Sequence, residues 1–202
     1  MDKSDPSVYI IVSWSPMVFR EDLGSPFMLE FITDREIYEK VIGDRIPKAG
    51  KFLWLGTSDL KDLHVDKKGR MVPFLEVLSD LAKKSVEIRL LHAKEPGPAF
   101  RRDFDKYPNL IKGMERILCP RVHFKSVVID GRFAYTGSAN LTGAGMGAKS
   151  DDKRNFEAGI ITDQPQIINK VIEQFDAIWR GEHCTTCKRK QYCADYKDLL
   201  LK

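Results

Sequence analysis

Residue types that suit phosphate chemistry lie close together between positions 123 and 140. His123 and Lys125 are two residues apart, and Ser138 and Asn140 follow after Gly137. An imidazole can attack phosphorus to form a covalent phosphohistidine, which divides one difficult displacement into two easier steps. An ammonium group with hydroxyl and amide donors can hold the non-bridging oxygens, where negative charge must be stabilised. The set predicts cleavage of a phosphodiester with no metal ion in the catalytic step.

The residues around this set predict a β-hairpin that brings the groups together. Residues 122–129 contain a β-branched run typical of a buried strand, on which His123 and Lys125 would share one face. Asp130-Gly131 is a hairpin turn signal, and residues 132–136 can return antiparallel. Any one of these residues alone is more often structural, so the prediction of a catalytic site depends on the spaced set.

The full pattern, His-x-Lys-x4-Asp-x6-Gly-Ser-x-Asn, resembles the signature of the phospholipase D superfamily. The match is complete at His123, Lys125, Asp130, Gly137, Ser138 and Asn140. Asn155-Phe156-Glu157 resembles a later element of the family, and the resemblance covers about residues 30–180. It implies that His123 is the nucleophile and that Glu157 orients it. It also implies that Lys125, Ser138 and Asn140 bind phosphate. Asp130 belongs to the catalytic motif, but the resemblance gives it a structural more than a chemical role.

The chain carries one copy of this motif. His92-Ala93-Lys94 is not a second copy, because no matching Asp or Gly-Ser-x-Asn follows it. Members of the superfamily use two histidines across one phosphate, so the resemblance implies a homodimer with two His123 side chains facing each other. A two-fold dimer is the commonest oligomer geometry. The second His123, protonated, would supply a proton to the leaving oxygen and then activate water.

The order of predicted elements indicates an α/β fold. Strands are expected near 8–13, 51–56, 86–92, 122–129, 132–136 and 156–161, and helices near 34–43, 71–84, 109–116 and 165–180. Interleaved helices and strands indicate a mixed β-sheet flanked by helices, as in a phospholipase D-like sandwich. Residues 14–30 are expected to form an irregular connection. Residues 1–180 would be the catalytic domain, and residues 181–202 a cysteine-containing C-terminal tail.

Composition favours a globular protein with a polyanionic partner. The 202 residues are 43% hydrophobic and 31% charged, with a formal net charge of +4. No apolar stretch is long enough for a transmembrane helix. The apolar run near the N-terminus, residues 8–13, is too short and has the wrong flanking residues for a signal peptide. The sequence therefore predicts a cytoplasmic protein. The Gly-rich segment 141–154 could close over substrate with Lys149, Lys153 and Arg154, or be a mobile surface loop.

Three cysteines cluster near the C-terminus as Cys184, Cys187 and Cys193, and Cys119 lies apart from them. In a cytosolic protein such clustering suggests a metal more than disulfides. Zinc would need four ligands, with His183 or Cys119 as the fourth, and a [4Fe–4S] cluster would need four thiolates, with Cys119 as the natural partner. The spacing resembles the C-terminal cysteine triplet of iron–sulfur nucleases of the RecB type. A structural cluster or zinc is expected, and free thiols or a disulfide are the alternative.

The leading functional hypothesis is a metal-independent endonuclease that hydrolyses DNA or RNA. A phospholipid phosphodiesterase or transphosphatidylase is the alternative with the same chemistry. A lipase would be expected to expose an apolar surface or carry a signal sequence. The candidates for such a surface, Phe19, Phe27, Met28 and Leu29, are more easily explained as core residues. The alternative from another class is a non-catalytic nucleic-acid-binding subunit of a DNA defence or repair system.

Overall fold

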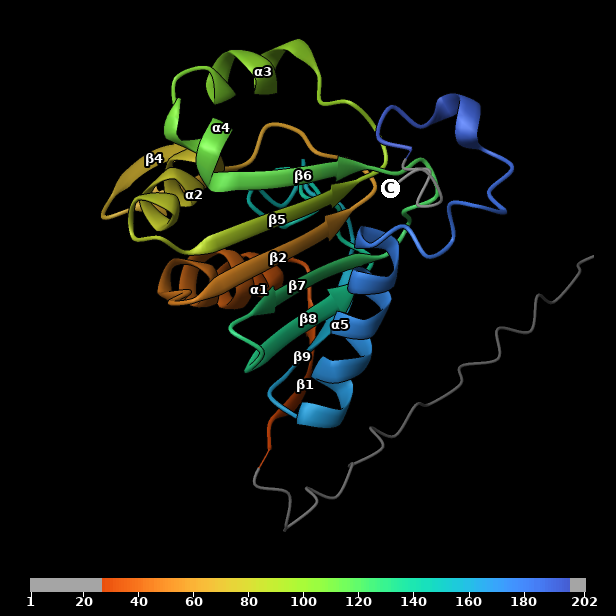
Figure 1. The fold of residues 1–202 in the computed structure, drawn as a ribbon. Helices are drawn as coiled ribbons and strands as arrows, with labels where there is room; N and C mark the ends of the chain where they lie inside the picture. The colour runs from red at the N-terminus through yellow and green to blue at the C-terminus, as the bar shows by residue number, and fades with distance from the viewer. Residues whose placement is uncertain (1–26, 197–202) are drawn as a thin grey trace, which may run out of the picture.

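The structure is a computed structural model that describes residues 27–196 (Figure 1). Its strands are β1 Leu29–Thr33, β2 Phe52–Thr57, β3 His64–Lys67, β4 Arg70–Pro73, β5 Glu87–His92, β6 Met114–Leu118, β7 Lys125–Ile129, β8 Phe133–Gly137 and β9 Ala158–Thr162. Its helices are α1 Arg35–Ile37, α2 Phe74–Lys83, α3 Pro98–Phe104, α4 Asn109–Gly113 and α5 Pro165–Trp179, with a π-helical η1 Tyr38–Arg45 and 3₁₀ turns η2 Ile46–Lys48 and η3 Lys190–Tyr192. The predicted α/β class is confirmed.

Seven strands form one mixed sheet in the order β1-β9-β8-β7-β2-β5-β6. Strands β2, β5 and β6 are parallel, and the other neighbouring pairs are antiparallel. The carboxyl ends of the parallel strands and of β8 therefore share one edge of the sheet with the start of β7 (Figure 1). Most of the candidate site residues predicted from the sequence lie at that edge.

Helices cover both faces of the sheet. The main core joins one face to α1, η1, α2 and α4, with Ile42, Leu55, Leu78, Leu110 and Val127 among its members. On the other face α5 is the helix that packs on the sheet within residues 27–196. It does so through the apolar stripe predicted for it, with Ile168 and Phe175 buried (Figure 1). A strand covered on both faces reads as a continuous apolar run, and all five residues of β7 are buried. No helix within residues 27–196 has the length and apolar character needed to cross a bilayer.

Two predicted helices are shorter than expected because strand pairing overrides local propensity. The helix expected over 71–84 begins at Phe74, since residues 70–73 pair with β3 in a small hairpin. The helix expected over 109–116 ends at Gly113, and Met114–Leu118 pairs parallel with β5. Strands β1, β3, β4 and β6 were not predicted.

Expectations near the N-terminus are partly wrong. The strand expected at 8–13 and Phe19 lie outside the described residues. Leu29 and Glu30, expected in an irregular connection, begin edge strand β1. Met28 packs partly against the core, but Phe27 is 42% and Leu29 54% exposed. Both side chains were expected to pack in the core. Leu29 lies on an edge strand and Phe27 just before it, where neither side chain is covered on all sides.

Candidate active site

The β7–β8 hairpin forms as predicted and sets the register of the site. The backbone N–H of Arg132 donates to the carbonyl of Ile129 across the turn, at 2.9 Å. Asp130 and Gly131 between them have φ values of 56° and 66°, the left-handed pair required by a tight type I′ hairpin turn. Lys125 is paired with Gly137, so the residues that follow Gly137 emerge beside the start of β7.

His123 and Lys125 are adjacent at this edge, although not on a common strand. Strand β7 begins at Lys125, so the prediction that His123 lies within the strand is wrong. His123 is exposed, whereas Lys125 is only 6% exposed. The Lys125 ammonium donates to the His123 carbonyl at 2.6 Å and lies 3.5 Å from its Nδ1. Burial lowers the pKa of Lys125, and the nearby Glu157 carboxylate acts in the opposite direction.

Glu157 is held by the side chains of Ser138 and Asn155 and by both the side chain and the backbone of Asp34. Its carboxylate accepts hydrogen bonds from the Ser138 hydroxyl and, at 3.0 Å, from the Asn155 amide. Its backbone N–H donates to the Asp34 carboxylate at 2.8 Å, and its carbonyl accepts from the Asp34 N–H at 2.9 Å. Asp34 adopts an unusual backbone with φ of 46°, a strain typical of residues that fix a functional group. Asp34 was not predicted as a site residue, because no motif around it in the sequence indicates such a role.

The hydrogen bond that the resemblance implies between Glu157 and His123 is not formed within residues 27–196. For Nε2 of His123 to attack phosphorus, Nδ1 must carry the ring proton and donate it to an acceptor. In this structure Nδ1 faces the ammonium of Lys125 instead. His123 is exposed and precedes the strand, and attack by its Nε2 would require its ring to turn away from Lys125.

The Ser138 hydroxyl donates its hydrogen bond to Glu157 in this structure, so it is not free to donate to a phosphate. A hydroxyl has one proton, and that of Ser138 is directed to Glu157. Its oxygen accepts from the backbone N–H of Ala158 at 3.1 Å. Phosphate binding by the Ser138 hydroxyl would therefore require it to release Glu157.

Asn140 is oriented for donation. Its side-chain oxygen accepts from the Ser58 N–H at 3.2 Å, the Ser58 hydroxyl at 2.7 Å and the Asp59 N–H at 3.2 Å. These bonds identify the oxygen of the amide and so fix its orientation. The NH₂ group makes no hydrogen bond in the described part of the chain. Sequence analysis missed Ser58 and Asp59. Their position directly after strand β2, at the carboxyl edge of a sheet, is the signal that could have found them.

Asp130 lies at the other end of the hairpin from Lys125. Its carboxylate accepts from the backbone N–H groups of Gly50 at 2.9 Å, Lys51 at 2.7 Å and Phe52 at 2.9 Å. Partial burial by itself would raise the pKa of Asp130, but these donors outweigh it and the pKa lies below its usual value. Its contacts tie the turn to the start of β2, which agrees with the structural role that the resemblance implies.

The Gly-rich segment 141–154 has two parts. Leu141 and Met146 are buried, and Gly147, at φ of 72°, passes so close to Asp34 that a Cβ there would meet its carbonyl oxygen at 2.3 Å. Lys149 and Lys153 in the second part are exposed, and Arg154 pairs with Asp151 at 2.6 Å. The first part is thus fixed to the core, and the second presents cations near the site.

His92 lies outside this site. It ends strand β5 as expected, is 1% exposed, and its Nδ1 is 2.7 Å from the Lys94 carbonyl oxygen. Burial lowers its pKa, and the Lys94 bond acts in the opposite direction. It is a core histidine.

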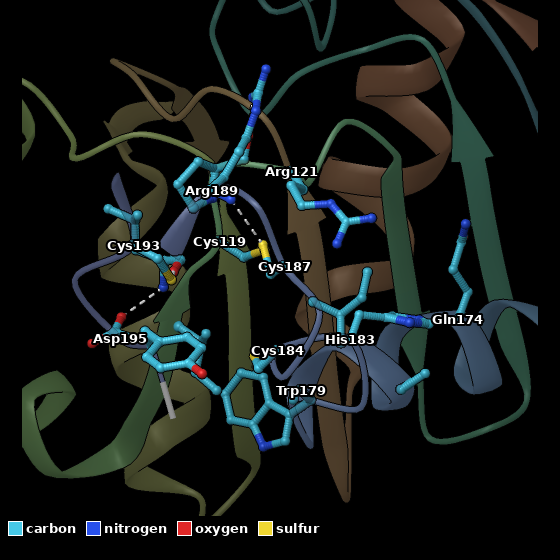
Figure 2. Close-up of a pocket in the computed structure, with 17 residues that line it drawn as sticks. Cys119, Arg121, Gln174, Trp179, His183, Cys184, Cys187, Arg189, Cys193 and Asp195 are labelled. Carbon is cyan, nitrogen blue, oxygen red and sulfur yellow. Dashed lines mark hydrogen bonds between the residues drawn. The ribbon is translucent and has the colours of Figure 1, made fainter. Parts of the chain in front are cut away.

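The cysteines gather at a second place on the same edge. Cys119, Cys184, Cys187 and Cys193 all line one cavity of about 270 Å³ between the end of β6 and the tail (Figure 2). All four are free thiols. Within residues 27–196 no three His, Cys, Asp or Glu side chains lie close enough together to hold a single metal ion.

Comparison with known proteins identifies the family. The model of the family described as "Cardiolipin synthase, PLD-like domain" matches residues 42–179, more than half of the chain. A search of curated proteins finds no significant match.

Solved structures share the fold at low sequence identity. NucT from Helicobacter pylori is similar at a TM-score of 0.58 and 14% identity, over 76% of this chain and 96% of that one. Nuc from Salmonella typhimurium, a phospholipase D family member, is similar at 0.57 and 14%, over 76% and 95%. Phosphatidylserine synthase from Haemophilus influenzae is similar at 0.55 and 14%, over 77% of this chain and 39% of that one. With the match over residues 42–179 and the shared fold, the chain belongs to the phospholipase D superfamily.

Proposed function

We propose that the protein is a metal-independent phosphodiesterase that hydrolyses nucleic acid through a phosphohistidine at His123. The observation that carries this proposal is the pairing of an exposed imidazole with a buried ammonium 3.5 Å away, at the end of a rigid hairpin. Asn140 presents its amide at the same edge. A cation and a neutral donor beside a nucleophile are what the charge of a phosphoryl transition state requires.

The reaction follows two displacements. In the first, Nε2 of His123 forms a bond to phosphorus, the bond from phosphorus to the leaving oxygen breaks, and a second histidine gives that oxygen a proton. In the second, water attacks the phosphohistidine, the P–N bond breaks, and the second histidine takes the proton of the water. Lys125 and Asn140 hold the non-bridging oxygens in both steps.

The second histidine is His123 of another copy of this chain. The sequence carries one motif, and His123 is exposed, so it can face a copy of itself across a two-fold axis. Beside Glu157, the ring of Phe156 is 94% exposed, and burying such a ring is worth about 1.5–3 kcal/mol. Light scattering should find a dimer, and Phe156→Ser should weaken it. A strictly monomeric, fully active wild-type protein would contradict the shared site.

Charge favours nucleic acid as the substrate. The chain has a formal net charge of +4, and Lys149 and Lys153 on the Gly-rich segment are exposed and form no ion pair among residues 27–196. A polyanion longer than one phosphodiester can contact these cations as well as the site, and its binding would weaken as salt rises. Both a nucleic-acid substrate and a cytoplasmic location remain predictions from the sequence.

Cleavage assays with excess EDTA test the proposal. Wild-type protein and His123→Ala should be incubated with single-stranded and double-stranded DNA and with RNA. Cleavage by wild type and not by the variant is expected. If neither protein cleaves any nucleic acid but both bind it equally, the alternative of a non-catalytic binding subunit replaces the enzyme.

Exposed apolar residues favour one second candidate, a phospholipid phosphodiesterase. Leu29 and Phe31 on β1 are 54% and 68% exposed, and Phe27 just before the strand is 42% exposed; such a patch can contact a lipid surface. One similar structure is a phosphatidylserine synthase. Release of headgroup from phospholipid vesicles by wild type, with no cleavage of nucleic acid, would select this candidate.

A further inference from the structure

The structure places four cysteines from distant parts of the sequence around one cavity. Cys119 follows strand β6, whereas Cys184, Cys187 and Cys193 come from the tail that follows α5. Figure 2 shows their side chains on different sides of the cavity, with Arg121 and Trp179 also on its wall. The sequence alone gave Cys119 no position relative to the other three; the fold brings it to them.

The tail has too little apolar surface to hold this arrangement unaided. Residues 181–196 contain no Val, Ile, Leu, Met, Phe or Trp. A segment of this composition cannot bury enough apolar area to offset the conformational entropy it loses. Small segments of this kind are ordered by disulfides or by bound metal, and all four thiols here are free.

The backbone of the tail presents its thiols from a series of tight turns. The N–H groups of Cys184, Cys187 and Cys193 each close a turn onto the carbonyl three residues earlier. The Cys187 sulfur accepts a hydrogen bond from the Arg189 N–H at 3.4 Å. The cationic side chain of Arg121 also lines the cavity. An N–H donor and a nearby cation are features that stabilise a thiolate, which is the form of cysteine that binds metal.

Contacts to the end of β6 fix the tail over the cavity. The Asp195 carboxylate accepts from the Leu118 N–H at 2.7 Å, the Cys193 thiol donates to the Leu118 carbonyl at 3.4 Å, and Arg189 donates to the Pro120 carbonyl at 3.3 Å. These contacts hold Cys193 and Cys187 against the same cavity that Cys119 lines.

The spacing of the cysteines around the cavity favours one kind of metal centre over the other. A single zinc ion gathers four ligands at about 2.0–2.3 Å, which leaves almost no space between them. Here the four cysteines are among the residues that line a cavity of about 270 Å³, and no three candidate ligands in the described part of the chain approach one point. A cubane cluster keeps its four sulfur ligands further apart than one ion does. We propose that Cys119, Cys184, Cys187 and Cys193 bind a [4Fe–4S] cluster in this cavity, which joins the tail to the end of β6.

Metal and sulfide content of the full-length protein tests this proposal independently of any phosphodiesterase activity. Protein purified without oxygen, or reconstituted with ferrous iron and sulfide, should contain about four iron and four acid-labile sulfide per chain and absorb broadly in the visible range. One zinc per chain in a colourless protein would overturn the cluster. A metal-free protein that does not take up iron under these conditions would overturn the site.

Two matched variants test the ligand set. Cys119→Ser should lose most of the iron and sulfide although the tail triplet is intact. His183→Gln alters another residue that lines the cavity and should keep the full content. Loss of the metal from His183→Gln, with retention in Cys119→Ser, would replace the proposal with a Cys₃His zinc site. Circular dichroism of both variants should match that of wild type, since Cys119 and His183 lie outside the helices and strands.

Discussion

The β7–β8 hairpin and the tail 181–196 meet the same edge of the sheet but are held there in different ways. The hairpin is fixed by a ladder of backbone hydrogen bonds and by a buried strand. The tail is fixed by three side-chain contacts and a set of turns. Of the candidate catalytic residues, Lys125 and Asp130 lie on the hairpin and His123 directly before it, and the thiols lie on or beside the tail. Under our two proposals, the fold itself positions the catalytic groups, whereas the tail depends on a bound metal centre for its order.

The largest effect on catalysis is expected from His123→Ala, which tests whether the reaction takes place beside the β7–β8 hairpin. Loss of the nucleophile should lower kcat by about 1000-fold or more, with the fold unchanged because the side chain is exposed. Initial rates in EDTA measure the effect. His64→Ala is the matched control, because His64 is only partly buried and pairs with Asp62, at 2.8 Å, outside the β7–β8 hairpin. If Cys119→Ser lowered kcat as much as His123→Ala does, the two regions would not have separate roles.

Lys125→Met should lower kcat by about 100-fold, because the cation that holds the phosphate oxygens is lost. The thermal stability should not fall, since burying a cation is itself costly. Lys153→Met, at an exposed position, is the control and should retain most activity. A large loss of stability in Lys125→Met would mean that Lys125 is chiefly structural.

The pH dependence of stability sharpens the same prediction. Burial lowers the pKa of Lys125 below 10.5, so between the lowered value and 10.5 the unfolded chain binds more protons than the folded one. The contribution of Lys125 to stability should therefore be least favourable below the lowered pKa and improve as pH rises toward 10.5. Lys125→Met should lack this improvement in denaturant titrations at increasing pH.

Asp130→Ala should lower the free energy of unfolding by about 1–3 kcal/mol, because three backbone N–H groups lose their acceptor. Activity per folded molecule should stay near wild type. Asp66→Ala removes the acceptor for one N–H in the β3–β4 turn and should cost less. Because the pKa of Asp130 is lowered, its contribution is present above 3.8 and lost as pH falls through the folded-state value. Loss of activity without loss of stability would give Asp130 a chemical role.

The smallest effect on the whole molecule is expected in hydrogen exchange of the tail. Amides of residues 181–196 should exchange slowly in protein with its metal centre and rapidly once the metal is removed. Amides of β7 and β8 should stay protected in both forms, because their bonds belong to the central sheet. Equal protection of the tail with and without metal would show that the tail folds without a ligand.

Much of the fold and the motif could be predicted from the sequence because they depend on local patterns. The turn at Asp130-Gly131, the buried run of β7 and the apolar stripe of α5 each carry a periodic or turn signal. Strands β1 and β6 could not be predicted, since their pairing with β9 and β5 depends on distant partners. Asp34 and Ser58 were missed for the same reason: their contacts to Glu157 and Asn140 exist only in the fold.

Trapping the covalent intermediate tests the central claim most directly. Wild type and His123→Ala should be mixed with end-labelled oligonucleotides in EDTA, quenched with denaturant at alkaline pH, and the label on the chain located by mass spectrometry. The account predicts a label on His123 of wild type that acid releases, and none on the variant. Turnover by wild type without any bound label, together with comparable cleavage by His123→Ala, would contradict it.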